Sequence, residues 1–201
     1  MKLYHSVTSP YVRKVMMALH LAGRAAEVEL VPGSGTALEP NPGTVSANPL
    51  GKVPCLVTEE GLSLYDSRVI TRHLDARFGI GLYPEGDALW PVLAREALAE
   101  GMLDAALLVV YESRLRPPEL RFSPWVKGQM SKVYRGLGHL EGEARTFGDR
   151  SDAAWVAVAC ALGYLDFRFS EMGWREGRPA LTEWFARAAE TPAFKATAPE
   201  G

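Results

Sequence analysis

Cysteine is scarce in this sequence: among 201 residues only Cys55 and Cys160 occur, each flanked by apolar neighbours. Two isolated cysteines do not provide the disulfide framework that stabilises many small secreted proteins. The start of the chain also lacks the pattern of a secretory signal. We therefore expect two free thiols and a cytoplasmic location, where thiols stay reduced.

The sequence also lacks an excess of basic charge and a long hydrophobic run. Lys and Arg number 22 against 24 acidic residues, for a net charge of −2, and they form no basic stripe. We expect no nucleic-acid partner, since binding to phosphates requires clustered positive charge. The uncharged stretch Ala153–Leu165 is shorter than the ~18 residues of a membrane-spanning helix. It predicts a buried helix, and we expect no membrane partner.

Metal-binding and phosphate-binding motifs are missing as well. The four histidines, His5, His20, His73 and His139, have no partners at metal-ligand spacing, and two separate cysteines do not make a zinc site. The sequence has no phosphate-binding loop with Lys-Ser/Thr and no Gly-x-Ser-x-Gly turn. We expect neither a metal site nor a bound cofactor.

Residues 1–78 alternate between short strands and helices. A strand at 2–6, a helix from Ser9-Pro10 to Gly23 and a strand at 27–31 predict a parallel β-α-β unit. A connection rich in Gly, Pro, Ser and Thr follows at 32–48. Strands at 55–58 and 62–65 then predict a hairpin, and a helix from Asp66-Ser67 ends before Gly79 with Ile70, Leu74 and Val69 turned inward. The order is βαβ-ββα, an α/β domain.

Residues 79–86 contain one proline and three glycines and are the best candidate for a linker. No convincing strand follows. Helical apolar spacing recurs at 90–109, 126–147, 152–169 and 179–189, and the tail from Pro192 reads as irregular. The sequence therefore predicts an all-α helical bundle domain at 87–201.

Three short segments could carry chemistry. The first is Thr8-Ser9-Pro10-Tyr11, where a strand gives way to a helix. Ordinary capping explains it, because Ser is a favoured N-cap and Pro suits the first turn. A hydroxyl beside a helix N-terminus would also favour a bound thiolate over a thiol, because both stabilise negative charge.

The other two segments flank the predicted hairpin. Asn48–Pro54 is either an ordinary turn before a strand or, with a cis Val53-Pro54 bond, a segment whose Val53 backbone pairs with an extended peptide. Asp66-Ser67 is either a helix cap or a receptor for a ligand's ammonium and carboxylate groups. The sequence leaves both alternatives open.

Together, in this order, the three segments resemble the cytosolic glutathione S-transferases over nearly the whole chain. The characteristic stretches are Ser9–Val15, Asn48–Pro54 and Tyr65-Asp66-Ser67, and Cys160–Arg168 is similar to small bacterial members. The resemblance implies a thioredoxin-like N-terminal domain that binds glutathione as co-substrate. It also implies a helical domain that shapes a pocket for an electrophile, and a homodimer.

The resemblance also implies roles for individual residues. Ser9, with Thr8 as the alternative, would stabilise the thiolate, since redox relatives have cysteines where this chain has Ser9 and Val12. Lys52 would contact the glycine end of glutathione, and Val53, before Pro54, would pair with the cysteinyl backbone. Asp66 and Ser67 would hold the γ-glutamyl group. The candidates for the second-substrate pocket are Tyr11, Leu108, Tyr111 and Trp125, although core packing is the preferred interpretation of Leu108.

The activity expected from this resemblance is transfer of glutathione to a small hydrophobic electrophile. Glutathione-dependent reduction of peroxides or disulfides requires the same thiolate and is one alternative. A non-catalytic protein that keeps the fold for protein interaction is another. Specificity depends on the geometry of the second pocket and cannot be assigned from the fold.

Overall fold

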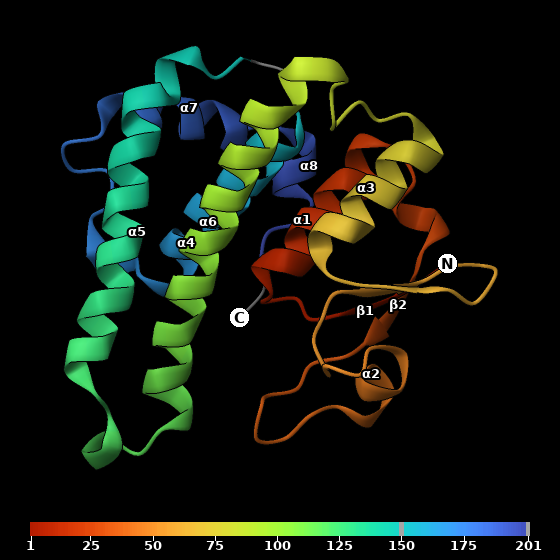
Figure 1. Cartoon of the computed structure of the whole chain (residues 1–201), viewed down its shortest axis with the longest axis horizontal. Helices are drawn as coiled ribbons and strands as arrows, with labels where there is room; N and C mark the ends of the chain where they lie inside the picture. Colours follow the sequence, from red (N-terminus) through yellow and green to blue (C-terminus); the bar gives the residue numbers. More distant parts are fainter. Residues whose placement is uncertain (149–150, 200–201) are drawn as a thin grey trace. The chain divides into compact units, whose positions relative to one another are not determined.

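The computed structural model describes residues 1–148 and 151–199. The chain divides into two compact units (Figure 1). The first comprises Met1–Pro84 together with the residues from Thr191 on, and the second comprises Glu85–Glu190. The change between them falls inside the predicted linker. The end of the chain groups with the first unit, whereas the sequence assigned it to the second domain.

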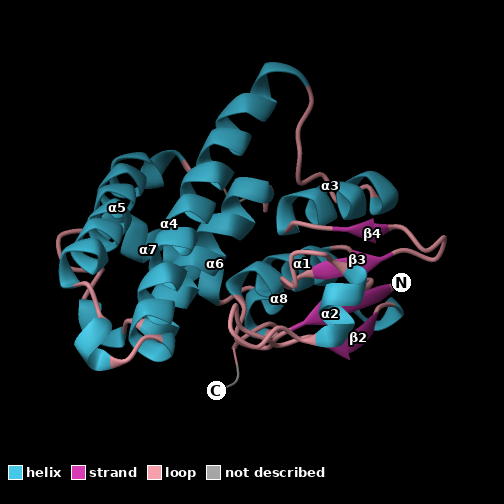
Figure 2. Cartoon of the chain, turned by 60° about the horizontal axis from the view of Figure 1, so that its bottom comes forward, coloured by secondary structure: helices cyan, strands magenta, loops and turns pink. Residues whose placement is uncertain are grey.

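The first unit is built on a four-stranded mixed sheet (Figure 2). Its strands are β1 (Lys2–His5), β2 (Glu29–Pro32), β3 (Cys55–Val57) and β4 (Ser63–Leu64). Their order across the sheet is β2-β1-β3-β4. The β1–β2 pair is parallel, while β3 runs antiparallel to both β1 and β4. The predicted β-α-β unit and hairpin are therefore confirmed.

Helices cover both faces of this sheet. Figure 1 shows α1 (Pro10–Leu21) and α3 (Ser67–Phe78) side by side on one face and α2 (Pro42–Ala47) on the other. The cross-strand pair Leu3 and Leu56 is fully buried, as are Ile70 and Leu74 of α3. Val69 was expected to point inward, but it is 45% exposed. The buried face of α3 is thus narrower than the apolar pattern predicted.

Two short helices were missed in the sequence. Helix α2 lies inside the 32–48 connection and is capped by Asn41, whose Oδ1 accepts a hydrogen bond from the Thr44 amide at 3.0 Å. Helix α8 (Pro192–Lys195) lies in the tail that was predicted to be irregular, and it packs against α1. Both are too short to show an apolar repeat. The Gly- and Pro-rich composition around α2 also masked its cap.

The second unit is a helical bundle, as predicted. It contains α4 (Leu89–Leu115), α5 (Ser123–Glu143), α6 (Ala153–Arg168) and α7 (Pro179–Ala189). Every residue of α6 from Ala153 to Leu165 is buried, because α4 and α7 pack against it. Short 3₁₀ helices lie at Ala25–Glu27, Gly86–Ala88, Pro118–Leu120, Ala144–Thr146 and Ser170–Met172.

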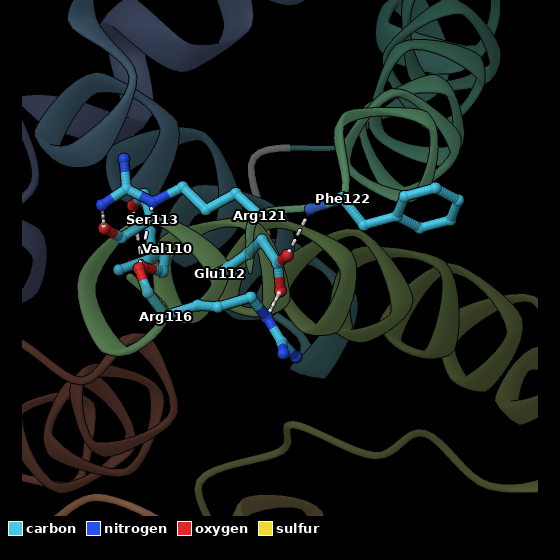
Figure 3. A network of polar contacts seen from close by, with 6 residues as sticks. All are labelled: Val110, Glu112, Ser113, Arg116, Arg121 and Phe122. Carbon is cyan, nitrogen blue, oxygen red and sulfur yellow. Dashed lines mark hydrogen bonds and ion pairs between the residues drawn. The ribbon is translucent and has the colours of Figure 1, made fainter. Parts of the chain in front are cut away.

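A polar network closes the connection between α4 and α5 (Figure 3). The buried Glu112 carboxylate accepts from the Phe122 amide at 2.8 Å and from Arg116 Nε at 2.9 Å. Arg121 Nε donates to the Arg116 carbonyl oxygen at 3.1 Å, and its Nη2 donates to the Ser113 carbonyl oxygen. The end of α4 and the start of α5 are therefore joined through one carboxylate and two guanidinium groups.

Cys55 and Cys160 are both buried free thiols, and burial raises the pKa of Cys55, so this thiol stays protonated at neutral pH. Within residues 1–148 and 151–199, no group of His, Cys, Asp or Glu could hold a metal ion. No helix in the described part of the chain is both long and apolar enough to span a membrane.

Candidate functional site

The topology of the sheet brings the predicted segments to one edge. His5 pairs with Pro32 at the carboxyl ends of the parallel strands β1 and β2. Strand β3 begins at this end, because Cys55 pairs with Tyr4. Strand β4 runs antiparallel to β3 and so ends there too. Residues 6–9, 52–54 and 65–67 therefore lie along one edge of the sheet, which we call the loop edge.

Ser9 connects the loop edge to α1. It is the N-cap of this helix, and its Oγ accepts from the Val12 amide at 3.3 Å. The capping interpretation is thus confirmed, but capping uses only part of the hydrogen-bonding capacity of the hydroxyl. A hydroxyl carries one proton and two lone pairs, so accepting from Val12 leaves the proton available for a ligand. The neighbouring Thr8 Oγ1 lies 3.4 Å from Ser6 Oγ.

The loop before β3 is organised by the buried side chain of Asn48. Its Nδ2 donates to the Lys52 carbonyl oxygen at 2.8 Å, and its Oδ1 accepts from the Leu50 amide at 3.0 Å. The Lys52 side chain is exposed. The Val53-Pro54 peptide bond is cis, the isomer that the sequence left open. One amide side chain therefore bonds two main-chain groups of the turn that leads to Val53.

Gly33 lies close to both Thr44 of α2 and Val53. Thr44 is fully buried, and its Oγ1 donates to the Gly33 carbonyl oxygen at 2.9 Å. A Cβ added to Gly33 would lie 2.6 Å from Thr44 Oγ1 and 3.0 Å from Val53 Cγ1. Position 33 therefore has no room for a side chain. Gly33 and Thr44 were not predicted from the sequence, which included Asn48 only as the first residue of the candidate loop. The Asn41-Pro42 cap was the one local signal of this support.

Asp66 and Ser67 start α3 at the loop edge. Asp66 is the N-cap, with Oδ1 accepting from the Arg68 amide at 3.0 Å and Oδ2 accepting from Arg68 Nη2 at 2.8 Å. Partial burial alone would raise the pKa of Asp66, but the hydrogen bonds and charge of Arg68 outweigh it and hold that pKa below its usual value. Asp66 is therefore a carboxylate at neutral pH. Ser67 is almost fully buried, while Asp66 is exposed.

The four candidates for the second-substrate pocket belong to two units. Tyr11 lies on α1 of the first unit and is half-buried. Leu108 and Tyr111 lie on α4 and Trp125 lies on α5, all in the second unit. Leu108 is 41% exposed, so core packing does not explain it. Tyr111 and Trp125 are half-buried. The roles of all four remain predictions.

Comparison with known families identifies the class of protein that this fold defines. Residues 8–77 match the N-terminal domain of glutathione S-transferases, and residues 123–187 match their C-terminal domain. Together these matches cover more than half of the chain. The chain belongs to the glutathione S-transferase family, which uses glutathione as a substrate.

Individual relatives match nearly the full length. An uncharacterized GST-like protein, YibF of Escherichia coli K12, is 35% identical over 99% of this chain and 98% of its own length. A glutathione transferase family member from Pseudomonas fluorescens Pf-5 with bound glutathione is 42% identical, with a TM-score of 0.97 over 100% of this chain and 99% of that one. A second structure from that organism contains S-(propanoic acid)-glutathione, with 41% identity, a TM-score of 0.92 and full coverage of both chains.

Proposed function

We propose that the chain is a glutathione transferase that conjugates the glutathione thiolate to a small hydrophobic electrophile. The observation that carries this proposal is the loop edge. It assembles a capping hydroxyl, a loop fixed by Asn48 and an ionised Asp66 beside the N-termini of α1 and α3. The glutathione bound to the similar Pseudomonas fluorescens protein supports the same ligand here.

Glutathione is an extended tripeptide with charges at both ends, and the loop edge offers a complement to each part. Asp66 would receive the γ-glutamyl ammonium, because its carboxylate has lone pairs beyond those used by Arg68. Ser67 and the first amides of α3 would receive the adjacent carboxylate. The Val53 backbone, preceding Pro54, would pair with the cysteinyl residue, and the exposed Lys52 ammonium would contact the glycine carboxylate.

The chemical step begins with an ionised sulfur. A free thiol has a pKa of ~8.5, so most of it is protonated at neutral pH. The Ser9 hydroxyl proton would donate to the sulfur anion, and the N-terminus of α1 would add favourable electrostatics. Thr8 is the alternative donor. The thiolate then attacks the electrophilic carbon, forming a C–S bond while the leaving group departs with its electron pair.

The electrophile would be held by apolar side chains, for which Leu108, Tyr111 and Trp125 are the candidates in the helical unit. The exposure of Leu108, a large apolar side chain on α4, supports a role outside the core. Pockets for small molecules are lined mainly by such side chains. We also propose a homodimer, on the basis of the family resemblance, and sedimentation of the purified protein tests it.

Calorimetry with glutathione, followed by turnover of an electrophile panel, tests the proposed function. We expect glutathione to bind to the wild-type protein and to Ser9→Ala, and turnover to be lost in Ser9→Ala. The matched control is Ser34→Ala, which removes an exposed hydroxyl from the 32–48 connection. A protein without affinity for glutathione would instead be the non-catalytic alternative. Turnover of peroxides but of no electrophile would indicate the reductase alternative.

A further inference from the structure

Two arginines at the C-terminal ends of helices α4 and α6 form no ion pair in the described part of the chain. Arg114 lies in the last turn of α4, and Arg168 is the last residue of α6. Across residues 1–148 and 151–199, neither forms an ion pair with a carboxylate. Their neighbours differ, because Arg116 pairs with Glu112 and Arg175 pairs with Asp166. Two positive charges at these helix ends are therefore left without a compensating negative charge in the described chain.

The guanidinium of Arg168 is held in place but incompletely satisfied. Its central carbon lies 4.0 Å from the centre of the Phe167 ring. The Tyr164 hydroxyl belongs to the preceding helical turn, and Arg168 acts to lower its pKa. The Arg168 Nε is buried without a hydrogen-bond partner in the described structure. Buried donors of this kind are usually paired, so this atom indicates a missing acceptor.

Two tyrosine hydroxyls accompany these arginines. Tyr164 is 4% exposed and shares a face of α6 with Arg168, four positions later. Tyr111 shares a face of α4 with Arg114, three positions later, and α4 packs against α6. Arg168, Tyr111 and Arg114 all lie near enough to Tyr164 to influence its pKa. We call Tyr111, Arg114, Tyr164 and Arg168 the Tyr–Arg cluster.

Because Tyr164 is protonated, its hydroxyl can donate a hydrogen bond, as the two guanidinium groups of the cluster can. Burial raises the pKa of Tyr164, and this effect outweighs the opposing influence of Arg168 and Arg114. Its hydroxyl therefore keeps its proton at neutral pH and can donate it. Two guanidinium groups and a protonated phenol can together offer hydrogen bonds and positive charge to an anion. Arginine forks match the geometry of a carboxylate.

A simpler explanation is that both arginines stabilise helix C-termini, where the macrodipole favours positive charge. That explanation accounts for the position of Arg114 and for the charge of Arg168. It does not account for the buried unpartnered Nε or for the tyrosine hydroxyl beside it. An anionic ligand satisfies the donor and balances the charge.

We propose that the Tyr–Arg cluster binds the carboxylate of the second substrate, so that the enzyme prefers electrophiles with an apolar body and an anionic group. This inference rests on the proposed function and narrows its substrate class. Tyr111 belongs both to the cluster and to the predicted electrophile pocket. In the reaction, glutathione sulfur attacks the ring carbon of a chloronitrobenzoate, a C–S bond forms, the C–Cl bond breaks and chloride leaves with the electron pair.

A matched pair of electrophiles tests the preference. Para-chloro-meta-nitrobenzoate and para-chloro-meta-nitrobenzamide have nearly the same shape and differ by one negative charge. With each catalysed rate divided by its uncatalysed rate, we expect kcat/KM to favour the benzoate by ~10-fold or more, as for a hydrogen bond to a charged group. Arg168→Gln should abolish this preference. Equal kcat/KM values for the two compounds in the wild-type protein would overturn the proposal.

Two further variants separate the cluster from general effects of charge. Arg114→Gln changes an exposed side chain and should reduce the preference without affecting folding. Arg187→Gln removes the same charge from an exposed i,i+4 pair with Glu183 on α7 and should leave the preference intact. Loss of the preference in Arg187→Gln as well as in Arg168→Gln would contradict a specific site.

A binding measurement without glutathione separates this inference from the proposed function. The probe is meta-nitrobenzoate, which cannot react, titrated by calorimetry. We expect binding to the wild-type protein and binding weaker by ~10-fold or more in Arg168→Gln. If neither chlorodinitrobenzene nor the matched pair is turned over, the proposed function fails, while this difference in binding still supports an anion site. Equal binding to both proteins would overturn the inference.

Discussion

The guanidinium carbon of Arg13 lies 3.7 Å from the centre of the Phe194 ring, and Arg13 Nη2 donates to the Phe194 carbonyl oxygen at 3.0 Å. Arg13 Nε also donates to Thr197 Oγ1 at 3.4 Å. The arginine is 7% exposed, although it belongs to a helix that starts at the loop edge. One side chain of α1 therefore holds the end of the chain on the first unit.

The first prediction concerns this contact. Arg13→Ala should lower the free energy of unfolding by ~2–3 kcal/mol, because it removes hydrogen bonds from a charged donor and a cation–π contact. Denaturant unfolding measures the change. Arg24→Ala is the control, since Arg24 is an exposed residue of the same unit whose ion pair with Glu27 contributes ~1 kcal/mol at most. Equal losses in the two variants would show that the tail contact is not stabilising.

This contact also shows why the tail was mispredicted. Arg13 and Phe194 are 181 positions apart, and α8 is four residues long. A helix of one turn is not stable without tertiary contacts, so its formation depends on a distant side chain. Helices α6 and α7 were predicted nearly to the residue, because their apolar pattern and the Pro179 start are local signals. Elements that depend on local signals can be predicted from the sequence, whereas elements that depend on long-range contacts cannot.

The second prediction concerns Gly33. Gly33→Ala should destabilise the protein by ~1–3 kcal/mol, because its new methyl group would overlap the buried Thr44 hydroxyl and press on Val53. Glutathione affinity should fall as Val53 shifts. Gly101→Ala adds the same methyl group on α4, where nothing lies within 4 Å, and should be neutral or stabilising. Unchanged stability and affinity in Gly33→Ala would mean that this packing does not position Val53.

The third prediction concerns Asp66 and pH. Its pKa is lower in the folded protein than the ~3.9 of a free Asp, so its stabilising bonds are fully present above that value and are lost as the pH falls through the folded pKa. Arg68→Gln should raise this pKa and move the acid loss of glutathione affinity to higher pH. Calorimetry across the acid range measures the shift.

Two variants complete this test of Asp66. Asp66→Asn should weaken glutathione binding by ~10-fold or more at neutral pH, since the ammonium loses its ionic acceptor. Arg72→Gln removes a charge from the same helix, where Arg72 stacks on Tyr83. It should not change the pH at which glutathione affinity is lost in acid. Wild-type affinity in Asp66→Asn would remove Asp66 from the proposed site.

The fourth prediction concerns Glu112, at the connection between α4 and α5. The Phe122 amide, followed by Arg116, holds the pKa of Glu112 below its usual value. Its contribution to stability is therefore present above the unfolded pKa of ~4.3 and is lost as the pH falls through the folded value. Glu112→Gln should lower the denaturant midpoint of unfolding at neutral pH. In acid, where the wild-type carboxylate becomes protonated, the midpoints of the two proteins should differ less. Glu183→Gln, on the exposed face of α7, is the control.

The candidate site was predictable only in part. Ser9, Asp66 and Ser67 carry local capping signals, and the sheet topology places them with Lys52 and Val53 at the loop edge. The residues that hold this edge, Asn48 and Thr44, act through hydrogen bonds to main-chain atoms several positions away. Such bonds leave no periodic pattern in a sequence. The sequence therefore indicated the candidate ligand-binding residues but not the hydrogen bonds that hold them in place.

Titration of the bound glutathione thiol, followed by the ultraviolet absorbance of the thiolate, tests the central claim most directly. The account predicts that the bound thiol ionises well below the ~8.5 of a free thiol, and that Ser9→Ala raises this pKa by ~1 unit while glutathione stays bound. A bound thiol that titrates like free glutathione would contradict the account. So would a depressed pKa that is unchanged in both Ser9→Ala and Thr8→Ala.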